Sequence, residues 1–346
     1  MSTQIPKTMK AVQVPKTGGP EVLTLAEIPV PTPKDHEVLI KVNWTGTNYI
    51  DTFPLTLPDQ RSGLYPKPLP FTAGQDAVGT LVSLPKVSMA HTSLPPLQIG
   101  QHVLTCQGSS FAEYMVAPWW QVAPIPDGID LKEGVAMTTT LFTAMYLIRE
   151  SYEVKKGDWI LVRAAAGGVG LLLCQLGKYF GANVIGTVST PEKAALAKSN
   201  GADHILLTSS PSSENVSTIL SLTGGKGVHA VYDGVGKDTW EEDFEVVRPK
   251  ATIVTFGNAS GPVPPFAPLK LSPKALKVTR PTLGPFIAEP EDFARYAKEI
   301  FEIVQKGGLE FSIHKVYPFS AEGVAQSQMD IASRTTTGKL LIHVSD

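Results

Sequence analysis

The sequence predicts an α/β fold in which a doubly wound parallel-sheet domain is inserted in a mostly β domain. The first observation is length: a chain of 346 residues exceeds the roughly 250–300 residues that one hydrophobic core serves, so two domains are expected. The second is proline usage, since only Pro191 and Pro211 of 29 prolines lie between Asp127 and Arg248. Proline breaks helix interiors and central strands, so this middle segment should hold regular structure.

The third observation is that apolar strands and helices alternate through the middle segment. Gly181 and Gly201 follow two of the helices at the position that favours glycine. Such alternation favours right-handed crossovers and a parallel sheet. The expected helices cover residues 131–152, 168–180, 190–201 and 216–222, and the expected strands cover 159–162, 183–188, 204–207, 227–232 and 251–256.

The N-terminal flank has the pattern of a β domain. Strands are expected over residues 10–14 and 23–28, on either side of a glycine–proline turn. Val38, Ile40 and Val42 alternate as one buried strand face. Helices are hard to place before residue 125, which indicates a mostly β domain.

The C-terminal flank combines helices with a closing strand. Apolar residues from Phe293 to Val304 recur with helical spacing, and Gly307–Gly308 ends that helix. A further helix begins at Ser320, and a strand is expected over residues 339–344. We expect this flank to return to the N-terminal domain. The predicted division is a discontinuous domain over residues 1–128 and 279–346, with an inserted domain over residues 129–278.

The composition excludes several classes of protein. Thirty Lys+Arg against 32 Asp+Glu give a net charge of −2, which offers no electrostatic footprint for nucleic acid or an anionic membrane. Two cysteines, Cys106 and Cys174, are too few for a disulfide framework or a four-cysteine zinc site. The sequence shows neither a signal peptide nor an apolar run of the roughly 20 residues that span a bilayer. A cytoplasmic protein is therefore expected.

The strongest chemical signal is the glycine-rich run from Arg163 to Gly170, which follows a strand and opens a helix. In that context Gly167 lets the backbone approach a pyrophosphate, and Gly170 allows close packing of the helix on the strand. The pyrophosphate would lie on free N–H groups at the positive end of the helix. Ala165 replaces the first glycine of the usual G-x-G-x-x-G pattern. The alternative is a tight strand–helix turn that binds no ligand.

The end of the next strand indicates which dinucleotide is bound. An NAD site uses an acidic residue there to bind the ribose 2′-hydroxyl, whereas this chain has Val188 and Ser189 followed by Thr190 and Lys193. Hydroxyls and a lysine suit a 2′-phosphate, so NADPH is the predicted cofactor. Glu192 is the one nearby acid, in a helix's first turn, where acids stabilise the helix. The alternative role of Ser189 or Thr190 is simple N-capping.

Metal and nucleophile motifs are not apparent in the sequence. The seven histidines and two cysteines form neither C-x-x-C nor H-E-x-x-H, and no G-x-S-x-G nucleophile elbow occurs. His102 and Cys106 are the nearest pair, but residues four apart in a strand lie far apart along it, so structural roles are expected. Donors that polarise a substrate oxygen are sought instead in the polar run from Asn43 to Phe53 and at Tyr65. The alternative there is an ordinary loop with a packing tyrosine.

Five groups of residues, taken in chain order, resemble one family. They are Asn48–Thr52 with Arg61–Tyr65, Ala164–Gly170, Tyr232–Gly236, Thr255–Asn258 and Thr279–Pro281. Together they resemble the zinc-free, zeta-crystallin-like NADPH:quinone oxidoreductases of the medium-chain dehydrogenase/reductase superfamily, over nearly the whole chain. The resemblance implies a GroES-like catalytic domain, an inserted Rossmann domain that binds NADPH, and a homodimer joined through edge strands. Zinc-dependent relatives carry Gly-His-Glu near the position of Gly74–Asp76 and a four-cysteine lobe that this chain lacks.

The resemblance also implies roles for individual residues. The catalytic residues would be Asn48, Asp51 and Tyr65: Asn48 and Asp51 would line the nicotinamide and substrate cleft, and Tyr65 would lie at its mouth. Asn48 would also contact the cofactor, and so would residues at the nicotinamide end, the pyrophosphate, the adenosine 2′-phosphate and the strand ends: Thr143, Ala166, Gly167, Gly168, Val169, Gly170, Ser189, Lys193, Thr208, Phe256, Gly257, Asn258 and Arg334.

Some positions depart from the family pattern. Phe53 and Thr208 stand where the family often has tyrosine, which removes a hydroxyl and an adenine-stacking ring. Residues 54–60 look inserted and residues 87–96 look lengthened. These changes bear on substrate size and on the position of Tyr65.

The predicted activity is transfer of reducing equivalents from NADPH to a quinone without a metal, driven by positioning and electrostatics. Two alternatives stay open. One is reduction of the C=C bond of an alkenal or enone. The other is a non-catalytic role, structural or RNA-binding, and the near-neutral charge argues against the RNA version.

Overall fold

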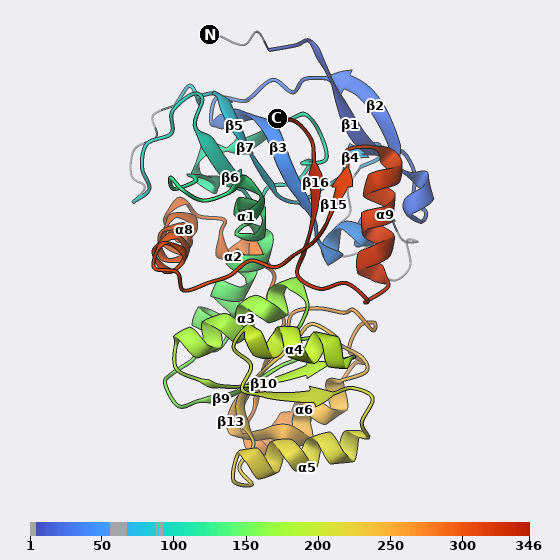
Figure 1. The fold of residues 1–346 in the computed structure, drawn as a ribbon, viewed down its shortest axis with the longest axis vertical. Coiled ribbons are helices and arrows are strands. Elements are labelled where there is room, and N and C mark those ends of the chain that lie inside the picture. Colours follow the sequence, from blue (N-terminus) through green and yellow to red (C-terminus); the bar gives the residue numbers. More distant parts are fainter. Residues whose placement is uncertain (1–4, 56–67, 88, 90–92) are drawn as a thin grey trace. The chain divides into compact units, whose positions relative to one another are not determined.

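The computed structural model describes residues 5–55, 68–87, 89 and 93–346. It divides into two compact units (Figure 1). The first unit comprises Met1–Thr139, Phe286–Glu302 and Phe311–Asp346, and the second comprises Thr140–Pro285 and Ile303–Glu310. The domain boundaries expected from the sequence, after residues 128 and 278, stay a prediction.

A six-stranded sheet forms the centre of the second unit. Its strands are β9 Trp159–Val162, β10 Asn183–Val188, β11 His204–Leu207, β12 Val228–Asp233, β13 Val247–Thr255 and β14 Lys277–Thr279. Every pairing in this sheet is parallel, and the order is β11-β10-β9-β12-β13-β14. The chain therefore builds outward from β9 in one direction and from β12 in the other. This is the order of the doubly wound Rossmann fold, so the predicted fold class is confirmed for this unit.

Helices cover both faces of that sheet. Figure 1 shows α3 and α4 on one face and α5 and α6 on the other. The helices of the chain are α1 Leu131–Ala136, α2 Thr139–Tyr146, α3 Gly168–Tyr179, α4 Pro191–Ser199, α5 Ser212–Leu222, α6 Trp240–Val246, α7 Leu283–Phe286, α8 Pro290–Gln305 and α9 Ala321–Ala332. The short 3-10 helices are Pro20–Val22, Tyr49–Leu55, Trp119–Gln121 and Pro268–Lys274, and a π-helical turn covers Leu147–Ser151.

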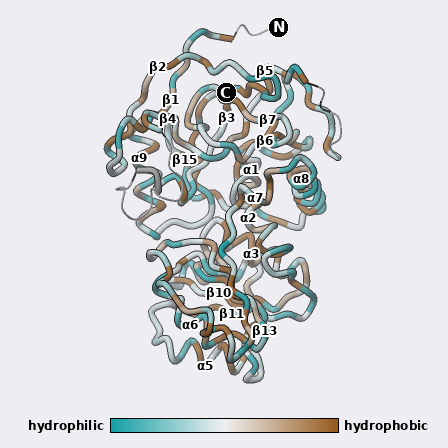
Figure 2. The backbone as a smooth tube through the Cα atoms, turned by 180° about the vertical axis from the view of Figure 1, so that it is seen from behind, coloured by the Kyte–Doolittle hydropathy of each residue, from teal (hydrophilic) through white to brown (hydrophobic). Residues whose placement is uncertain are grey.

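Burial of the apolar strands explains why these residues form this sheet. Leu161, Ile185, Val231 and Ile253, one from each of four neighbouring strands, are fully buried in one cluster with Trp240. Figure 2 shows the corresponding hydrophobic segments along β10, β11 and β13. Strands buried on both faces have nearly continuous apolar sequences, which is why they could be predicted to within a few residues.

The expected helical stretch over residues 131–152 is divided in the structure into α1, α2 and a π-helical turn, with a break between α1 and α2. The break falls at Thr138, whose hydroxyl donates to the Val135 carbonyl and to the Asp76 carboxylate. A threonine hydroxyl that bonds a backbone carbonyl competes with the helical ladder. The partner Asp76 is distant in sequence, so no local pattern announces the break.

The first unit is built on two sheets. A three-stranded sheet has the order β2-β1-β4, and a seven-stranded sheet has the order β15-β16-β3-β5-β6-β8, with β7 also paired to β3. The strands are β1 Thr8–Val14, β2 Thr24–Pro29, β3 Glu37–Thr47, β4 Phe71–Thr72, β5 Ala77–Ser83, β6 His102–Thr105, β7 Tyr114–Pro118, β8 Val122–Pro124, β15 Ile313–Pro318 and β16 Lys339–His343. The mostly β character expected of this part is confirmed.

Strand β3 is the centre of this unit. Val38, Ile40 and Val42 are buried as expected, but Leu39 and Asn43 on the opposite face are buried too. The expected buried face is therefore confirmed, and β3 also buries residues outside that face.

The C-terminal segment returns to the first unit, as its sequence suggests. Strand β16 pairs antiparallel with β3, with Leu340 opposite Thr47 and Leu341 opposite Gly46. This register brings Lys339, the first residue of β16, to the end of β3. In the described part of the chain, no helix has the length and apolar character that a bilayer span requires.

Candidate functional site

Residues predicted to bind the cofactor gather along one edge of the six-stranded sheet. The glycine run 166–170 follows β9, Ser189 follows β10, Thr208 follows β11, and residues 256–258 follow β13. Because all six strands are parallel, their carboxyl ends share this edge. The strand order reverses between β9 and β12, and ligands of open α/β sheets bind at that point.

The turn between β9 and α3 exposes helix N–H groups. Gly167 is the N-cap of α3, and because glycine has no side chain it cannot cap the helix's free N–H groups. Its own N–H donates to the Ala164 carbonyl at 2.9 Å. A Cβ on Gly170 would overlap the Ala164 oxygen and lie 2.9 Å from the Ala165 Cα. The run therefore brings the start of a 12-residue helix close to the strand. No side chain caps this start, so its N–H groups and the positive end of the helix dipole favour the binding of an anion.

Gly186 in β10 leaves space for Ala165, the alanine that replaces the first glycine of the motif. Ala165 is fully buried, and its N–H donates to the Thr187 carbonyl at 2.9 Å. A Cβ on Gly186 would lie only 2.8 Å from the Ala165 Cβ. Because Gly186 has no side chain, there is room for the methyl group of Ala165, which the usual glycine at position 165 would lack.

The end of β10 carries polar and cationic groups. Thr190 caps α4, since its Oγ1 accepts the Lys193 N–H at 3.3 Å. Of the two hydroxyls for which capping was the alternative, Thr190 is thus the one that caps, while Ser189 is exposed. Glu192 has a lowered pKa because it accepts hydrogen bonds from its own backbone and from Thr190. The pKa of Lys193 is lowered by partial burial.

The neighbouring strand ends complete this edge. The Thr208 N–H donates to the Val188 carbonyl at 2.9 Å, which holds the end of β11 against that of β10. Beyond β13, the Phe256 N–H donates to the Asp233 carbonyl at 2.8 Å. A Cβ on Gly257 would lie 2.5 Å from the Gly234 oxygen, so these two loops touch through their backbones.

Asp233 organises the loop after β12, a role that the sequence reasoning missed. Its carboxylate accepts from the N–H groups of Val235 at 2.7 Å and Gly236 at 3.2 Å, and from the Thr239 hydroxyl at 3.0 Å. Burial raises the Asp233 pKa, and these hydrogen bonds oppose the rise. The signal in the sequence was an aspartate followed by glycines directly after an apolar strand.

Arg163 forms a buried ionic cluster at the start of the glycine run. Its guanidinium donates to Asp243 Oδ1 through Nε at 2.9 Å and Nη2 at 2.7 Å, and to Glu242 through Nη1 at 2.6 Å. The Arg163 and Asp243 side chains are 3% and 0% exposed. Burial lowers the Arg163 pKa, but the attraction of the two carboxylates outweighs it and the net direction is upward. This cluster anchors β9 to α6 beneath the glycine run.

The first unit holds a second polar centre, around Asn48 and Asp51. Both side chains are 7% exposed. Asn48 follows β3, and its N–H donates to Asp51 Oδ2 at 2.7 Å, while the Asp51 N–H donates to the Asn48 carbonyl at 3.0 Å. The structure thus brings together the two described residues that were predicted to be catalytic.

Asp76 and Lys339 complete this centre, and sequence reasoning did not single them out as site residues. Lys339 Nζ donates to Asn48 Oδ1 at 2.7 Å and to Asp76 Oδ2 at 2.9 Å. Asp76 Oδ2 also accepts from Asn48 Nδ2 and from the Thr138 hydroxyl, each at 2.9 Å. Burial raises the pKa of the adjacent Cys106 thiol, and the Asp76 charge adds to the rise.

The remaining predicted residues are Tyr65, Thr143 and Arg334. Tyr65 and the segment 56–67 lie outside the described residues, as do residues 88 and 90–92 of the lengthened stretch. Thr143 is buried within α2, and Arg334 is exposed beyond α9, in the first unit. Their cofactor roles stay predictions.

His102 and Cys106, the nearest pair of possible metal ligands in the sequence, lie at opposite ends of β6. His102 is exposed at the start of β6 and Cys106 is buried beyond its end. Within residues 5–55, 68–87, 89 and 93–346, no three His, Cys, Asp or Glu side chains come together as a metal site would require.

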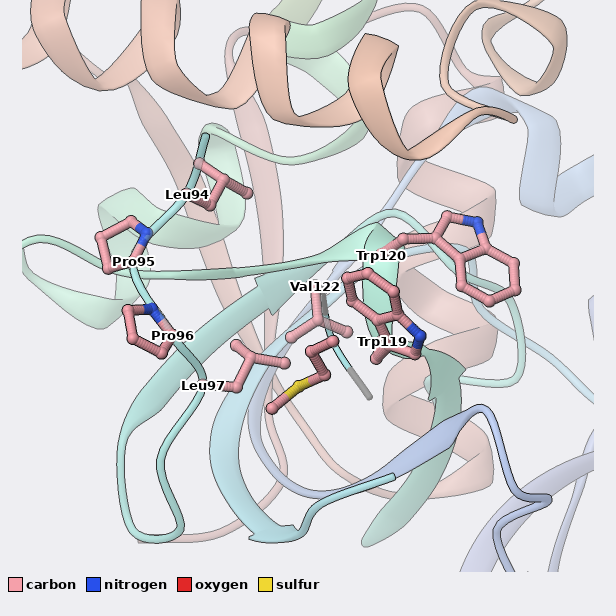
Figure 3. Close-up of a pocket in the computed structure, with 8 residues that line it drawn as sticks. Leu94, Pro95, Pro96, Leu97, Trp119, Trp120 and Val122 are labelled. Carbon is pink, nitrogen blue, oxygen red and sulfur yellow. The ribbon is translucent and has the colours of Figure 1, made fainter. Parts of the chain in front are cut away.

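A pocket of about 260 Å³ lies in the first unit. Figure 3 shows Pro95 and Pro96 on one side of it and Trp119 and Trp120 on the other. Its other lining residues are Met89, Leu94, Leu97 and Val122. None of these eight lining residues is titratable or belongs to the predicted site, so the pocket supplies no group for the expected chemistry.

Two family models match the chain. Residues 168–302 match the model described as zinc-binding dehydrogenase, and residues 34–127 match the alcohol dehydrogenase GroES-like domain. The second match confirms the GroES-like part of the predicted fold class.

Curated relatives match over nearly the full length. The quinone oxidoreductase of Pseudomonas aeruginosa is 38% identical over 338 residues, which cover 96% of this chain and 99% of the relative. The 2-haloacrylate reductase of a Burkholderia species is 30% identical over 343 residues, which cover 96% of this chain and 98% of the relative.

Solved structures match as well. A mycobacterial protein complexed with NADPH has a TM-score of 0.89 and 36% identity, with 97% of this chain and 100% of that chain covered. The Escherichia coli quinone oxidoreductase complexed with NADPH has a TM-score of 0.87 and 31% identity, with the same two shares, 97% and 100%.

Proposed function

We propose, from the premise that the chain belongs to the zeta-crystallin-like quinone oxidoreductases of the medium-chain dehydrogenase/reductase superfamily, that it oxidises NADPH and reduces a quinone. The balanced reaction is NADPH, a proton and a quinone giving NADP⁺ and a hydroquinone. The observation that carries the proposal is the similarity to quinone oxidoreductases over 96% of the chain. NADPH would supply the two electrons and one of the two hydrogens, and the second hydrogen would come from solvent or a protein donor.

The geometry of the glycine turn fits a dinucleotide. The uncapped start of α3 offers N–H groups and a positive dipole end to the pyrophosphate, through Ala166, Gly167, Gly168 and Val169. Gly170 keeps the helix close enough to β9 for this approach, because any side chain there would overlap Ala164. NADPH bound to the two homologous structures supports the choice of cofactor.

The choice of NADPH over NADH rests on the end of β10. Ser189 stands where an NAD site has its acid, so no carboxylate there would repel a 2′-phosphate. Lys193 lies in the first turn of α4, where its ammonium and the helix dipole both favour an anion. We infer that Ser189 and Lys193 bind the 2′-phosphate.

On the substrate side, Asn48 and Asp51 act by binding and orienting. The amide of Asn48 donates an N–H that polarises a carbonyl oxygen, and Asp51 holds the backbone at Asn48. A quinone is an intrinsically good electron acceptor, so positioning and electrostatic stabilisation suffice without a strong acid. We propose that the reaction needs no metal.

A second candidate function is reduction of an activated C=C bond. The full-length similarity to a 2-haloacrylate reductase favours it. A screen of NADPH oxidation over quinones, α,β-unsaturated aldehydes, haloacrylates and ketones separates the candidates. The proposal expects the highest kcat/KM with a quinone and no loss of rate in the presence of a chelator. A higher kcat/KM with an enal or haloacrylate would replace it with the second function.

We also propose a homodimer joined through the edge of the six-stranded sheet. Strand β14 is the last strand of that sheet and pairs with β13 on one side. Light scattering coupled to size-exclusion chromatography measures the mass directly, and a value near that of one chain, 37.1 kDa, would refute the dimer.

A further inference from the structure

A buried ion pair encloses the amide of Asn48. The side chains of Lys339 and Asp76 are 3% and 0% exposed, and their charged atoms are 2.9 Å apart. The Asn48 amide lies between them: its oxygen accepts from Lys339 at 2.7 Å and its nitrogen donates to Asp76 at 2.9 Å. The three side chains form a closed triangle of hydrogen bonds.

This triangle fixes which way the Asn48 amide faces. An ammonium only donates hydrogen bonds and a carboxylate only accepts them. Turning the amide by 180° would set its NH₂ group against the Lys339 ammonium and its oxygen against the Asp76 carboxylate. Two hydrogen bonds to charged groups would be lost at once. The amide therefore has one orientation.

The fixed orientation determines what Asn48 offers to a ligand. Its amide has two N–H bonds, and one of them is directed to Asp76. The other makes a contact with the Gly46 carbonyl at 3.5 Å, the outer limit for a hydrogen bond. This weakly engaged N–H is the one that can donate to a substrate oxygen.

The backbone of β3 is adapted to the lysine. A Cβ on Gly46 would overlap Lys339 Cε, and it would lie 2.8 Å from Val135 Cγ1 and 3.0 Å from Lys339 Nζ. The pairing of β16 with β3 brings Lys339 to this point. Glycine at position 46 thus leaves the space through which the lysine side chain reaches Asn48.

Stability alone does not account for such a pair. Removing two charges from water costs several kcal/mol each, and apolar replacements for a buried ion pair are often neutral or stabilising. Asp76 moreover accepts from three side chains and, at 3.2 Å, from the Gly46 N–H. These hydrogen bonds surround the Asn48 amide, which indicates that the ion pair serves to fix the orientation of that amide.

We propose that Lys339 and Asp76 are positioning residues for the reduction reaction, which hold the Asn48 amide so that one N–H is directed to the acceptor oxygen. The inference rests on the proposed function, because it takes Asn48 as the residue that contacts the acceptor. Lys339 itself is not a catalytic residue, since it acts through Asn48.

The test compares three variants of the full chain. Lys339→Met removes the charge and leaves Asp76 buried without its cation, so this variant risks unfolding. The double variant Asp76→Asn/Lys339→Met removes both charges and avoids that risk. Thr47→Val is the matched control: Thr47 is 1% exposed, one residue from Asn48, and its hydroxyl contacts Ser327 at 2.7 Å, outside the triangle.

We expect the double variant to lower kcat for the quinone about 10- to 100-fold, the usual effect of a misplaced contact, while the Kd for NADPH changes less than about threefold. Thr47→Val should lower the Tm but leave kcat within about threefold of wild type. A double variant with wild-type kcat, or a control with an equal loss of kcat, would overturn the proposal.

A second measurement separates this inference from the proposed function. The Nδ2 protons of Asn48 report the amide's orientation by NMR with no substrate present. We expect them to shift and exchange faster in the double variant and to stay unchanged in Thr47→Val. Unchanged Asn48 resonances in the double variant refute the positioning alone. Wild-type protein that binds NADPH but reduces no quinone refutes the proposed function alone.

Discussion

Replacement of Lys193 by alanine tests the assignment of the cofactor. Lys193 lies in the first turn of α4, at the end of β10, where a 2′-phosphate would be recognised. A charge-assisted hydrogen bond contributes about 1.5–3 kcal/mol when it is shielded from water. Lys193 is only partly buried, so screening reduces the contribution to about 1–2 kcal/mol. Lys193→Ala should therefore raise the Kd for NADPH about 5- to 30-fold.

The assay is titration of the protein with NADPH and, separately, with NADH. NADH lacks the 2′-phosphate, so its Kd should change less than about twofold in Lys193→Ala. Raising the salt concentration should narrow the difference between wild type and variant for NADPH, because screening weakens the ionic contact. Lys198→Ala is the matched control, as it removes an exposed lysine in the last turn of the same helix.

Two results would refute the reasoning. An equal loss of affinity for NADPH and NADH would mean that Lys193 supports the fold of this edge and does not read the phosphate. An equal loss in Lys198→Ala would mean that only the net charge of the unit matters.

Three further predictions concern the second unit. Gly186→Ala should lower the free energy of unfolding by about 1–3 kcal/mol through overpacking against Ala165, and adding Ala165→Gly should recover much of it in a denaturant titration; purely additive effects would contradict the contact. Arg163→Met should cost about 3–5 kcal/mol because it strands buried carboxylates, and Arg163→Met/Asp243→Leu should cost clearly less by the same titration; an equal or larger cost would argue against the ionic pairing. Burial raises the pKa of the Cys174 thiol to about 12, above the roughly 8.5 of an unfolded cysteine, so its contribution to stability is complete below about pH 8.5 and is lost as the pH rises toward 12; Cys174→Ala should flatten this alkaline decline, and an unchanged slope would count against it.

The sequence was informative where structure is set by short-range patterns. Strands β9, β10 and β11 could be predicted to the residue, because each is a short, mostly apolar run. Gly167 and Gly170 belong to this class too, since the atoms that a Cβ at either position would meet belong to Ala164 and Ala165, within six residues. Asn48 and Asp51 also depend on a short-range pattern, as they are three positions apart in the chain and bond to each other.

The sequence was uninformative where a contact joins distant segments. The break at Thr138 depends on Asp76, 62 positions away, and no pattern within the helix records it. Lys339 had the position of an ordinary first residue of a closing strand, yet it reaches Asn48 across a separation of 291 residues. Its role follows only from the register of β16 on β3. Such residues need a three-dimensional structure to be recognised.

The two groups of candidate residues, one in each unit, consequently differ in how they tolerate change. At the sheet edge, recognition relies on backbone N–H groups and strand ends, so side chains there vary: alanine stands at position 165, where the motif has glycine, and Thr208 where the related family often has tyrosine. Around Asn48, recognition relies on the paired charges of Lys339 and Asp76. Gly46 leaves space for the Lys339 side chain because it has none of its own. A change of Lys339 or Asp76 alone leaves an unpaired charge, so these two are expected to change only together. Cofactor binding in relatives should therefore persist across many substitutions, whereas efficient reduction should depend on the small set of residues that bonds Asn48.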